Sequence, residues 1–245
     1  MEKKIINNKT ILSIETSGKV CSVALAEFDA FSDVFIGSQN NFNKINFELI
    51  AEYSINVGNK HDKYCAELCS RILKDNNYDI SDIDTVAVSV GPGSFTGIRI
   101  GNAVAKGICF DLNNEIPLIA VPTLTALVNN AIHITNIYNS ENIKILAIIP
   151  SHSNLVYYQL FDKNGKQLTD IELVNLEILS QKYCNDNLII TTNSPININF
   201  GIYIPTLHYI SAASISKLGA MMYLNNEITN SIDIQPLYIQ EFIPK

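Results

Sequence analysis

The chain has 245 residues, a net charge of −7 and a hydrophobic fraction of 47%. This composition is typical of a globular protein and excludes a disordered chain, a collagen-like chain or a mini-protein. The length predicts one compact unit or two small lobes. Only two of the 17 basic residues are arginines, Arg71 and Arg99. An acidic chain without clustered cations is poorly suited to bind nucleic acid unless a partner supplies most of the contacts.

Nothing in the sequence predicts export or membrane insertion. The first residues carry charges but no apolar stretch of the length of a signal peptide. The longest apolar run, 145–150, is far shorter than the ~20 residues of a membrane span. Five cysteines lie scattered in apolar segments, which favours reduced thiols. We therefore expect a cytoplasmic protein.

The first half of the chain predicts strands and helices in alternation. A hairpin is expected where the strand-like segments 10–14 and 20–25 flank a polar turn. Apolar residues at helical spacing predict helices over 61–76 and 96–111, on either side of a buried strand at 84–90. Further strands are expected at 34–37, 47–55 and 117–121.

The second half repeats this alternation more weakly. A helix over 123–131 is expected to lead into strands at 144–149, 155–161 and 168–174, which would form an antiparallel meander. A strand at 188–192, a helix at 214–224 and an extended tail at 236–239 follow. The expected architecture is α/β and built twice, with a division between residues 1–122 and residues 123–245.

The helix predicted over 96–111 has two distinct faces. One is an apolar stripe, and the other is a strip of small residues. The stripe consists of Ile100, Ala103, Val104, Gly107 and Ile108, and the strip of Gly97, Gly101 and Ala105. A helix of this kind is expected to be covered on both sides.

The glycine-rich segment 91–101 is the strongest local motif. A strand that ends in a glycine turn and opens a helix presents free backbone N–H groups, which suit an anion such as phosphate. The alternative is a tight turn that binds nothing. The spacing fits neither a P-loop nor a dinucleotide-binding motif. The candidate residues for anion contact are Gly91, Gly93, Ser94, Thr96 and Arg99.

Three other features carry weaker signals. Glu15, Thr16 and Ser17 in the first turn could contact a hydrated metal or a nucleotide phosphate, or could form an ordinary polar turn. His61 opens the first helix without a second histidine one turn later. Cys65 and Cys69 share a helical face but make a poor zinc site, so we interpret them as core residues.

Several segments in the same order resemble the TsaB (YeaZ) family. They are Ile-Glu-Thr-Ser at 14–17, Cys-Ser-Val-Ala-Leu at 21–25, the helix that opens at His61, and Gly-Pro-Gly-Ser-Phe-Thr-Gly-Ile-Arg-Ile-Gly at 91–101. The similarity is strong over 10–28 and 60–128, and faint to the end. The segment at 91–101 is long and specific.

The resemblance implies the actin/Hsp70/sugar-kinase-like fold of two related lobes. It implies a non-catalytic subunit in the synthesis of threonylcarbamoyladenosine, the modified base beside the anticodon of tRNA. A TsaD-type transferase subunit would carry the chemistry, a TsaE-type ATPase would be the third component, and tRNA would be contacted through the complex. No catalytic residue, metal or cofactor of its own is expected, although ATP or ADP could bind where the two subunits meet.

The resemblance also implies docking through the two helices of the first lobe, which could pair two copies of the chain when the partner is absent. The candidate interface residues are His61, Tyr64, Cys65, Leu68, Ile72, Gly97, Gly101 and Ala105. A bulky residue at position 101 or 105 is expected to block docking without disturbing the fold.

The chain departs from the family pattern at three places. Glu15 replaces the usual Asp, Pro150-Ser151-His152 replaces Asp-Ala-Arg, and the stretch 29–58 is longer than usual. Two alternatives remain open: a stand-alone ATP-dependent enzyme or peptidase-like protein of the same fold, and a homodimeric regulator.

Overall fold

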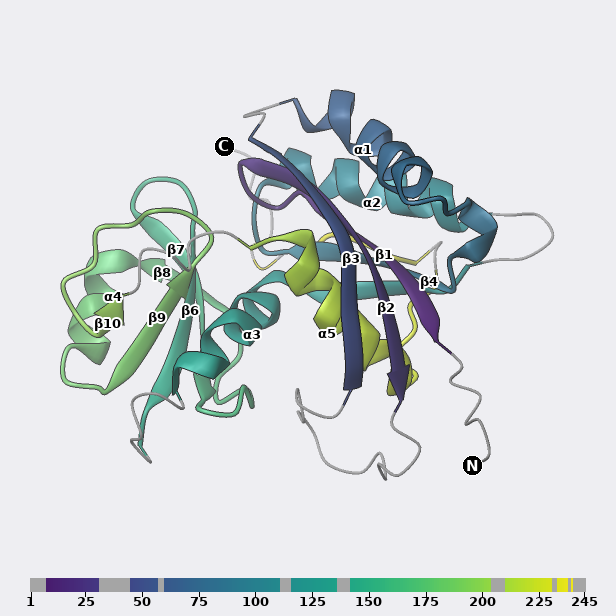
Figure 1. Cartoon of the computed structure of the whole chain (residues 1–245). Coiled ribbons are helices and arrows are strands. Elements are labelled where there is room, and N and C mark those ends of the chain that lie inside the picture. The colour runs from purple at the N-terminus through teal and green to yellow at the C-terminus, as the bar shows by residue number, and fades with distance from the viewer. Residues whose placement is uncertain are drawn as a thin grey trace, which may run out of the picture.

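A computed structural model describes residues 8–30, 45–56, 60–110, 116–135, 142–203, 210–230, 233–237 and 239. The described residues form two lobes, each built on a five-stranded sheet (Figure 1). The predicted strand at 34–37 lies outside these residues.

The first sheet has the order β3-β2-β1-β4-β5. Its three sequence-adjacent strands pair antiparallel, and β1, β4 and β5 pair parallel. The strands are β1 (Lys9–Glu15), β2 (Val20–Ala30), β3 (Ile45–Asn56), β4 (Thr85–Gly91) and β5 (Leu118–Pro122). The parallel crossovers run through α1 (His61–Asp75) and α2 (Phe95–Cys109).

The second sheet repeats this topology in the order β10-β9-β6-β7-β8. The antiparallel meander of β6, β7 and β8 and the parallel strands β6, β9 and β10 match the first lobe strand for strand. The strands are β6 (Lys144–Pro150), β7 (Leu155–Asp162), β8 (Glu172–Asn175), β9 (Leu188–Thr192) and β10 (Ile202–Tyr203), and the helix before β9 is α4 (Leu176–Tyr183). The two lobes are therefore two copies of one unit, as the actin/Hsp70/sugar-kinase-like fold requires.

Most of the predicted elements are confirmed within a few residues. Three differ. The strand expected at 168–174 starts only at Glu172, because Leu168 and Thr169 instead bond to Leu160 at the end of β7. The short helix α4 and the two-residue strand β10 were not expected, since neither is long enough to show a period.

The expected division at residue 122 needs a correction. The helix α5 (Ala212–Leu224) belongs to the second half of the chain but packs on β1, β2 and β4 of the first sheet. A Cβ on Gly219 would lie 2.6 Å from the Ala87 Cβ, so only a glycine allows this approach. The tail returns as well, because the Leu237 N–H donates to the Val90 carbonyl at 2.7 Å. Helix α5, Thr229 and Leu237 therefore contact the first lobe.

Helices cover both faces of the first sheet. α1 and α2 pack on one face, where Leu68 and Ala105 meet Ile14 and Val88 in one core cluster. α3 (Thr123–Thr135) and α5 lie between the two sheets and join both in a second cluster (Figure 1). The second lobe has its own outer core around Tyr158 and Leu179.

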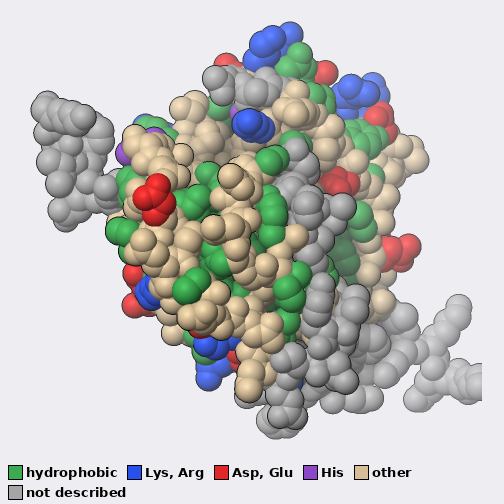
Figure 2. Space-filling model, turned by 90° about the vertical axis from the view of Figure 1, so that its left-hand side faces the viewer, with side chains coloured by type: hydrophobic (Ala, Val, Ile, Leu, Met, Phe, Trp, Pro, Cys, Tyr) green, Lys and Arg blue, Asp and Glu red, His purple; other side chains and the backbone are tan. Residues whose placement is uncertain are grey.

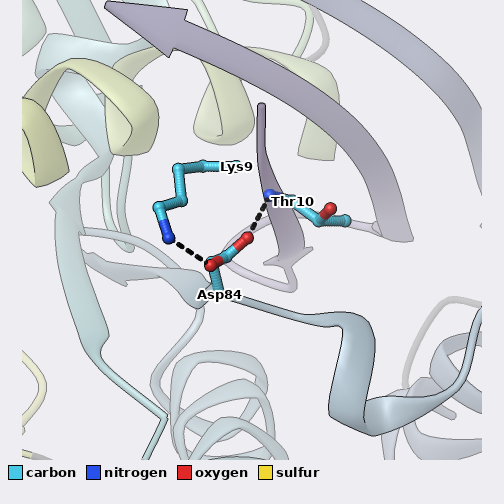
Figure 3. A network of polar contacts seen from close by, with 3 residues as sticks. All are labelled: Lys9, Thr10 and Asp84. Carbon is cyan, nitrogen blue, oxygen red and sulfur yellow. Dashed lines mark hydrogen bonds and ion pairs between the residues drawn. The ribbon is translucent and has the colours of Figure 1, made fainter. Parts of the chain in front are cut away.

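One polar network sets the register between β1 and β4 (Figure 3). Lys9 Nζ lies 2.6 Å from Asp84 Oδ1, and the Thr10 backbone N–H donates to Asp84 Oδ2 at 2.8 Å. The Asp84 N–H donates in return to the Thr10 carbonyl at 3.0 Å. The carboxylate of Asp84 thus joins the starts of two parallel strands.

Candidate partner-docking site

The two strongest sequence motifs meet in space, because the turn between β1 and β2 lies against the start of α2. The Ser94 N–H donates to the Ser17 carbonyl at 2.7 Å. A Cβ on Gly93 would lie 2.6 Å from that same carbonyl oxygen, and a Cβ on Gly97 or Gly101 would overlap Thr16. The glycines of α2 therefore allow the turn to pack directly on the helix backbone.

The anion-contact candidates divide into two groups instead of forming one site. Glu15, Thr16 and Ser17 are buried at the turn, and Gly93 lies against Ser17. Gly91 is buried next to Ile98 and Leu237. Ser94, Thr96 and Arg99 are exposed on the first turn of α2. Ser94 Oγ accepts a hydrogen bond from the Gly97 N–H at 3.2 Å, and the Arg99 guanidinium lies 3.7 Å from the Phe95 ring centroid. Ser94 is thus the N-cap of α2.

Glu15 is held inside the protein by its own turn. Its Oε1 accepts hydrogen bonds from the Ser17 N–H at 2.6 Å and from Ser17 Oγ at 2.5 Å. Burial raises the pKa of Glu15, and the hydrogen bonds from Ser17 oppose this only in part. Oε2 is buried, and the Ser89 hydroxyl lies close enough to lower the pKa of the carboxyl in part. The burial of this carboxyl and its hydrogen bonds within the turn fit an ordinary polar turn better than a metal or phosphate contact.

Most of the predicted interface residues face inward. His61, Cys65, Leu68 and Ile72 of α1 are buried in the chain's own core, and Tyr64 is half-buried. Gly97, Gly101 and Ala105 of α2 are buried as well, under the turn at Thr16 and the sheet. The expectation that a bulky residue at 101 leaves the fold intact is therefore wrong, because the small-residue strip packs on this chain itself.

The other face of α2 is the one left open. Ile100, Val104 and Ile108 are half-exposed, and Ala103 and Gly107 are exposed. The sequence placed the small-residue strip in the partner interface, whereas in the structure this strip is buried and the apolar stripe, which packs only partly against the core, is the more open face. The contact of Thr16 with Gly101 decides which face of α2 is buried. These two residues are far apart in the chain, so no local sequence pattern indicates the contact.

Between α1 and α2 runs a groove of about 930 Å³, which we call the docking groove. It is open to solvent over small and apolar side chains, with charged residues at one end. Its lining includes Ala66, Ser70, Leu73, Val104, Gly107 and Ile108. A Cβ on Gly107 would meet no atom within 4 Å. Small residues on two adjacent helices permit close approach of further helices.

Three of the cysteines in the core cluster under α1 and α2 lie on β2 and α1, and one of these, Cys69, also lines the groove. Cys21 of β2 and Cys65 and Cys69 of α1 are buried, which confirms the interpretation of Cys65 and Cys69 as core residues. A hydrogen bond with the Cys65 thiol, together with burial, raises the pKa of Cys21 far above its usual range. The Cys21 thiol is therefore a poor nucleophile.

The described residues contain no group of three or more His, Cys, Asp or Glu side chains placed to hold a metal ion. Nor is any helix in the described part of the chain long and apolar enough to cross a membrane.

Comparison with known proteins identifies relatives for most of the chain. Residues 53–187 match the family model described as TsaD, tRNA N6-adenosine threonylcarbamoyltransferase. A TsaB protein of Buchnera aphidicola is 31% identical over 64% of this chain and 59% of its own length. The TsaB protein of Haemophilus influenzae is 23% identical over 96% of this chain and 95% of its own length.

One solved structure confirms the fold over nearly the whole chain. YeaZ from Pseudomonas aeruginosa superposes with a TM-score of 0.70 and 19% identity, covering 94% of this chain and 100% of that one. The motifs, the duplicated sheets and the matched family model agree. The chain therefore belongs to the TsaD-type family and, within it, to the TsaB (YeaZ) proteins.

Proposed function

We propose that this chain is a non-catalytic subunit in the threonylcarbamoylation of adenosine beside the anticodon of tRNA. It binds a TsaD-type transferase subunit through the docking groove and holds that subunit in its working shape. The observation that carries the proposal is the exposed face of α1 and α2, where small and apolar side chains remain open to solvent.

The contents of the groove suit packing against helices. Ala66 and Ser70 of α1 face Val104 and Gly107 of α2 across it. None of these side chains is long, so the backbones of two partner helices can approach closely and bury Ile100 and Ile108. Lys74 and Asp79 at one end offer charges of both signs that can set the register of the partner.

The chemistry is assigned to the partner because this chain's own polar groups are directed inward. The Glu15 carboxyl is bonded to Ser17, and the Thr16 side chain packs on Gly101. This arrangement disfavours a stand-alone ATP-dependent enzyme. The net charge of −7 supports indirect contact with tRNA through the complex. A TsaE-type ATPase, ATP or ADP at the subunit junction, and a cytoplasmic location complete the proposal.

The test is reconstitution with a purified TsaD-type subunit, a TsaE-type ATPase, threonylcarbamoyl-AMP and unmodified tRNA. Activity is expected only when this chain is present. Equal activity without it, with every component shown to be folded, would contradict the proposal.

A matched pair of variants locates the docking surface. Gly107→Arg places a long charged side chain in the groove, where a Cβ meets nothing, and should lower partner affinity at least about 100-fold while Tm is retained. Gln181→Arg adds the same side chain to the exposed face of α4 and should bind like the wild type. Equal affinity of the two variants would exclude the groove.

The free chain is expected to pair with a second copy through the same groove. Light scattering should then give a dimer for the wild type and for Gln181→Arg, and a monomer for Gly107→Arg. A dimer that survives Gly107→Arg would place self-association elsewhere.

A further inference from the structure

The charged residues are unevenly divided between the two helices that flank the docking groove and the rest of the chain. We call residues 60–75 and 95–109, which are α1 with its N-cap Lys60 and α2, the docking helices. They lie side by side on the first sheet (Figure 1) and carry six basic and three acidic residues. Of the 17 basic and 24 acidic residues of the chain, 11 and 21 remain elsewhere. The docking helices therefore have a net charge of +3, and the rest of the chain has one of −10.

Two cations of α2 lie on one side of the helix. Arg99 and Lys106 are seven residues apart, which is two helical turns. Arg99 is exposed, and Lys106 is half-buried in the last turn. Between Phe95 and Cys109 the sequence of α2 contains no aspartate or glutamate. The positive charge of this helix is therefore not offset by a carboxylate of its own.

Two lysines of α1 lie on the side of that helix that lines the docking groove. Lys74 is part of the lining, and Lys63 lies eleven residues earlier, three turns away on the same side. Both side chains are exposed. The carboxylates of α1 are Asp62 in the first turn, Glu67 between the two lysines and Asp75 in the last turn. The Asp75 carboxylate accepts a hydrogen bond from the Tyr53 hydroxyl at 3.0 Å, so it is turned toward β3.

This distribution of charge distinguishes between possible occupants of the groove. Two copies of the chain that meet at the docking helices bring two net positive faces together, whereas an acidic protein face is attracted. A nucleic acid would be attracted as well, but small and apolar side chains line the groove, and they suit packing against helices and not contact with phosphates.

We propose that the surface of the partner that enters the docking groove is acidic, and that the positive charge of the docking helices favours this partner over a second copy of the chain. Like charges across an interface are a common means of discriminating against the wrong partner. The inference rests on the proposed function, because it specifies the chemistry of the subunit that binds in the groove.

The first test measures the association rate constant, kon, with a purified TsaD-type subunit by stopped flow at about 50 mM and about 500 mM NaCl. We expect kon to fall about 10-fold at the higher salt and the dissociation rate constant to change less than about 3-fold. If the folded wild type does not bind at either salt, the proposed function fails and this inference fails with it. If it binds with the same kon at both salts, only this inference is overturned.

The second test reverses the charge beside the groove. The double variant Lys63→Glu with Lys74→Glu should lower kon about 10-fold at low salt and remove its salt dependence. The matched control is Lys163→Glu with Lys166→Glu, which makes the same change in net charge at an exposed turn of the second lobe. Its kon should lie within about 3-fold of the wild type. Equal kon for the two double variants, or a faster kon for the groove variant, would overturn the inference.

The third test follows self-association by sedimentation equilibrium at low salt. The same groove variant should tighten the dimer of the free chain about 3-fold or more, because it removes repulsion between two positive faces. The groove variant therefore acts in opposite directions on the two complexes. Weakening of both complexes would show that the two lysines contribute packing and not charge, and would contradict the inference.

Unmodified tRNA provides the last control. We expect the free wild-type chain not to bind it at low salt, because the carboxylates of α1 and the acidic remainder of the chain repel phosphates. Binding of tRNA that is lost in the groove variant, with kon for the TsaD-type subunit unchanged, would assign the two lysines to RNA and overturn the inference.

Discussion

The two lobes share one sheet topology but differ in what covers it. In the first lobe, α1 and α2 lie side by side on the outer face and leave the docking groove between them. In the second lobe, α4 precedes β9, but an irregular segment, 193–201, connects β9 to β10 where the first lobe has α2. The two lobes thus share the arrangement of their strands, but among the described residues only the first lobe carries two helices side by side on its outer face.

The exposed faces differ accordingly. Figure 2 views the second lobe from outside and shows hydrophobic and uncharged side chains over its middle, with charged ones mainly near the edges. In the second lobe, Ile178 is exposed, while Ile196 and Ile198 are half-buried and alternate with exposed asparagines. Ile196 and Ile198 pack on the outer core of their own lobe, and among the described residues a paired-helix groove is found in the first lobe only. The two sheets have the same topology, so the lobes differ in the helices that cover them and in the surfaces that these helices form.

The two copies also share an ion pair at equivalent positions. Lys9 at the start of β1 pairs with Asp84 before β4, and Lys144 at the start of β6 pairs with Asp186 before β9. The first pair is 2.6 Å apart and the second 3.4 Å. Only Asp84 also accepts a hydrogen bond from a backbone N–H on the paired strand, that of Thr10. The contact that sets the register is tighter in the lobe that carries the groove.

The largest effect is expected where the first lobe packs a turn on a helix. Gly97→Ala would place a Cβ on the Thr16 carbonyl oxygen, and we expect a loss of about 3 kcal/mol or more, seen as a fall in Tm of about 6–12 °C or as insolubility. Gly107→Ala, on the open face of the same helix, should leave Tm unchanged or raise it. A Tm for Gly97→Ala within about 2 °C of the wild type would show that the turn does not need the glycine.

A second effect concerns pH, because Glu15 is buried in the turn of the first lobe. Burial raises the pKa of Glu15, so as pH rises the unfolded state loses this proton at a lower pH than the folded state does. The free energy of unfolding therefore falls as pH rises above about 4.5, the ordinary pKa of the group. Glu15→Gln keeps the acceptor for Ser17 and should be more stable than the wild type at pH 7, by about 2–4 °C in Tm. The gain should vanish toward pH 4. If the gain in Tm does not change with pH, it comes from packing and not from the protonation of Glu15.

A smaller effect sharpens the comparison of the two ion pairs. Asp84→Ala should cost about 1–2 kcal/mol, because it also leaves the Thr10 N–H without its acceptor. Asp186→Ala should cost about 0–0.5 kcal/mol, since its partly exposed pair is longer. Chemical denaturation of both variants measures the difference. Equal losses would mean that the backbone hydrogen bond contributes nothing beyond the ion pair.

Much of this molecule can be predicted from its sequence. The hairpin at Glu15, the strand that runs into Gly91 and the helices that open near His61 and Thr96 follow from local alternation, helical spacing and turn residues. These signals lie within a few residues of each other, and the family resemblance follows from the same segments. The glycines of 91–101 were also predicted to matter, although for anion or partner contact.

The tertiary structure decided which faces are open and which are closed. Helical spacing identifies the two faces of α2, but only the contact of Thr16 with Gly97 and Gly101 determines that the small-residue face is inside. In the same way, a helical pattern predicts α5, but Ser22, Glu52 and Ala87 determine that it packs on the first sheet. Each of these contacts joins residues distant in the chain. Periodicity reports only the residues nearby, and burial depends on what the fold brings against them.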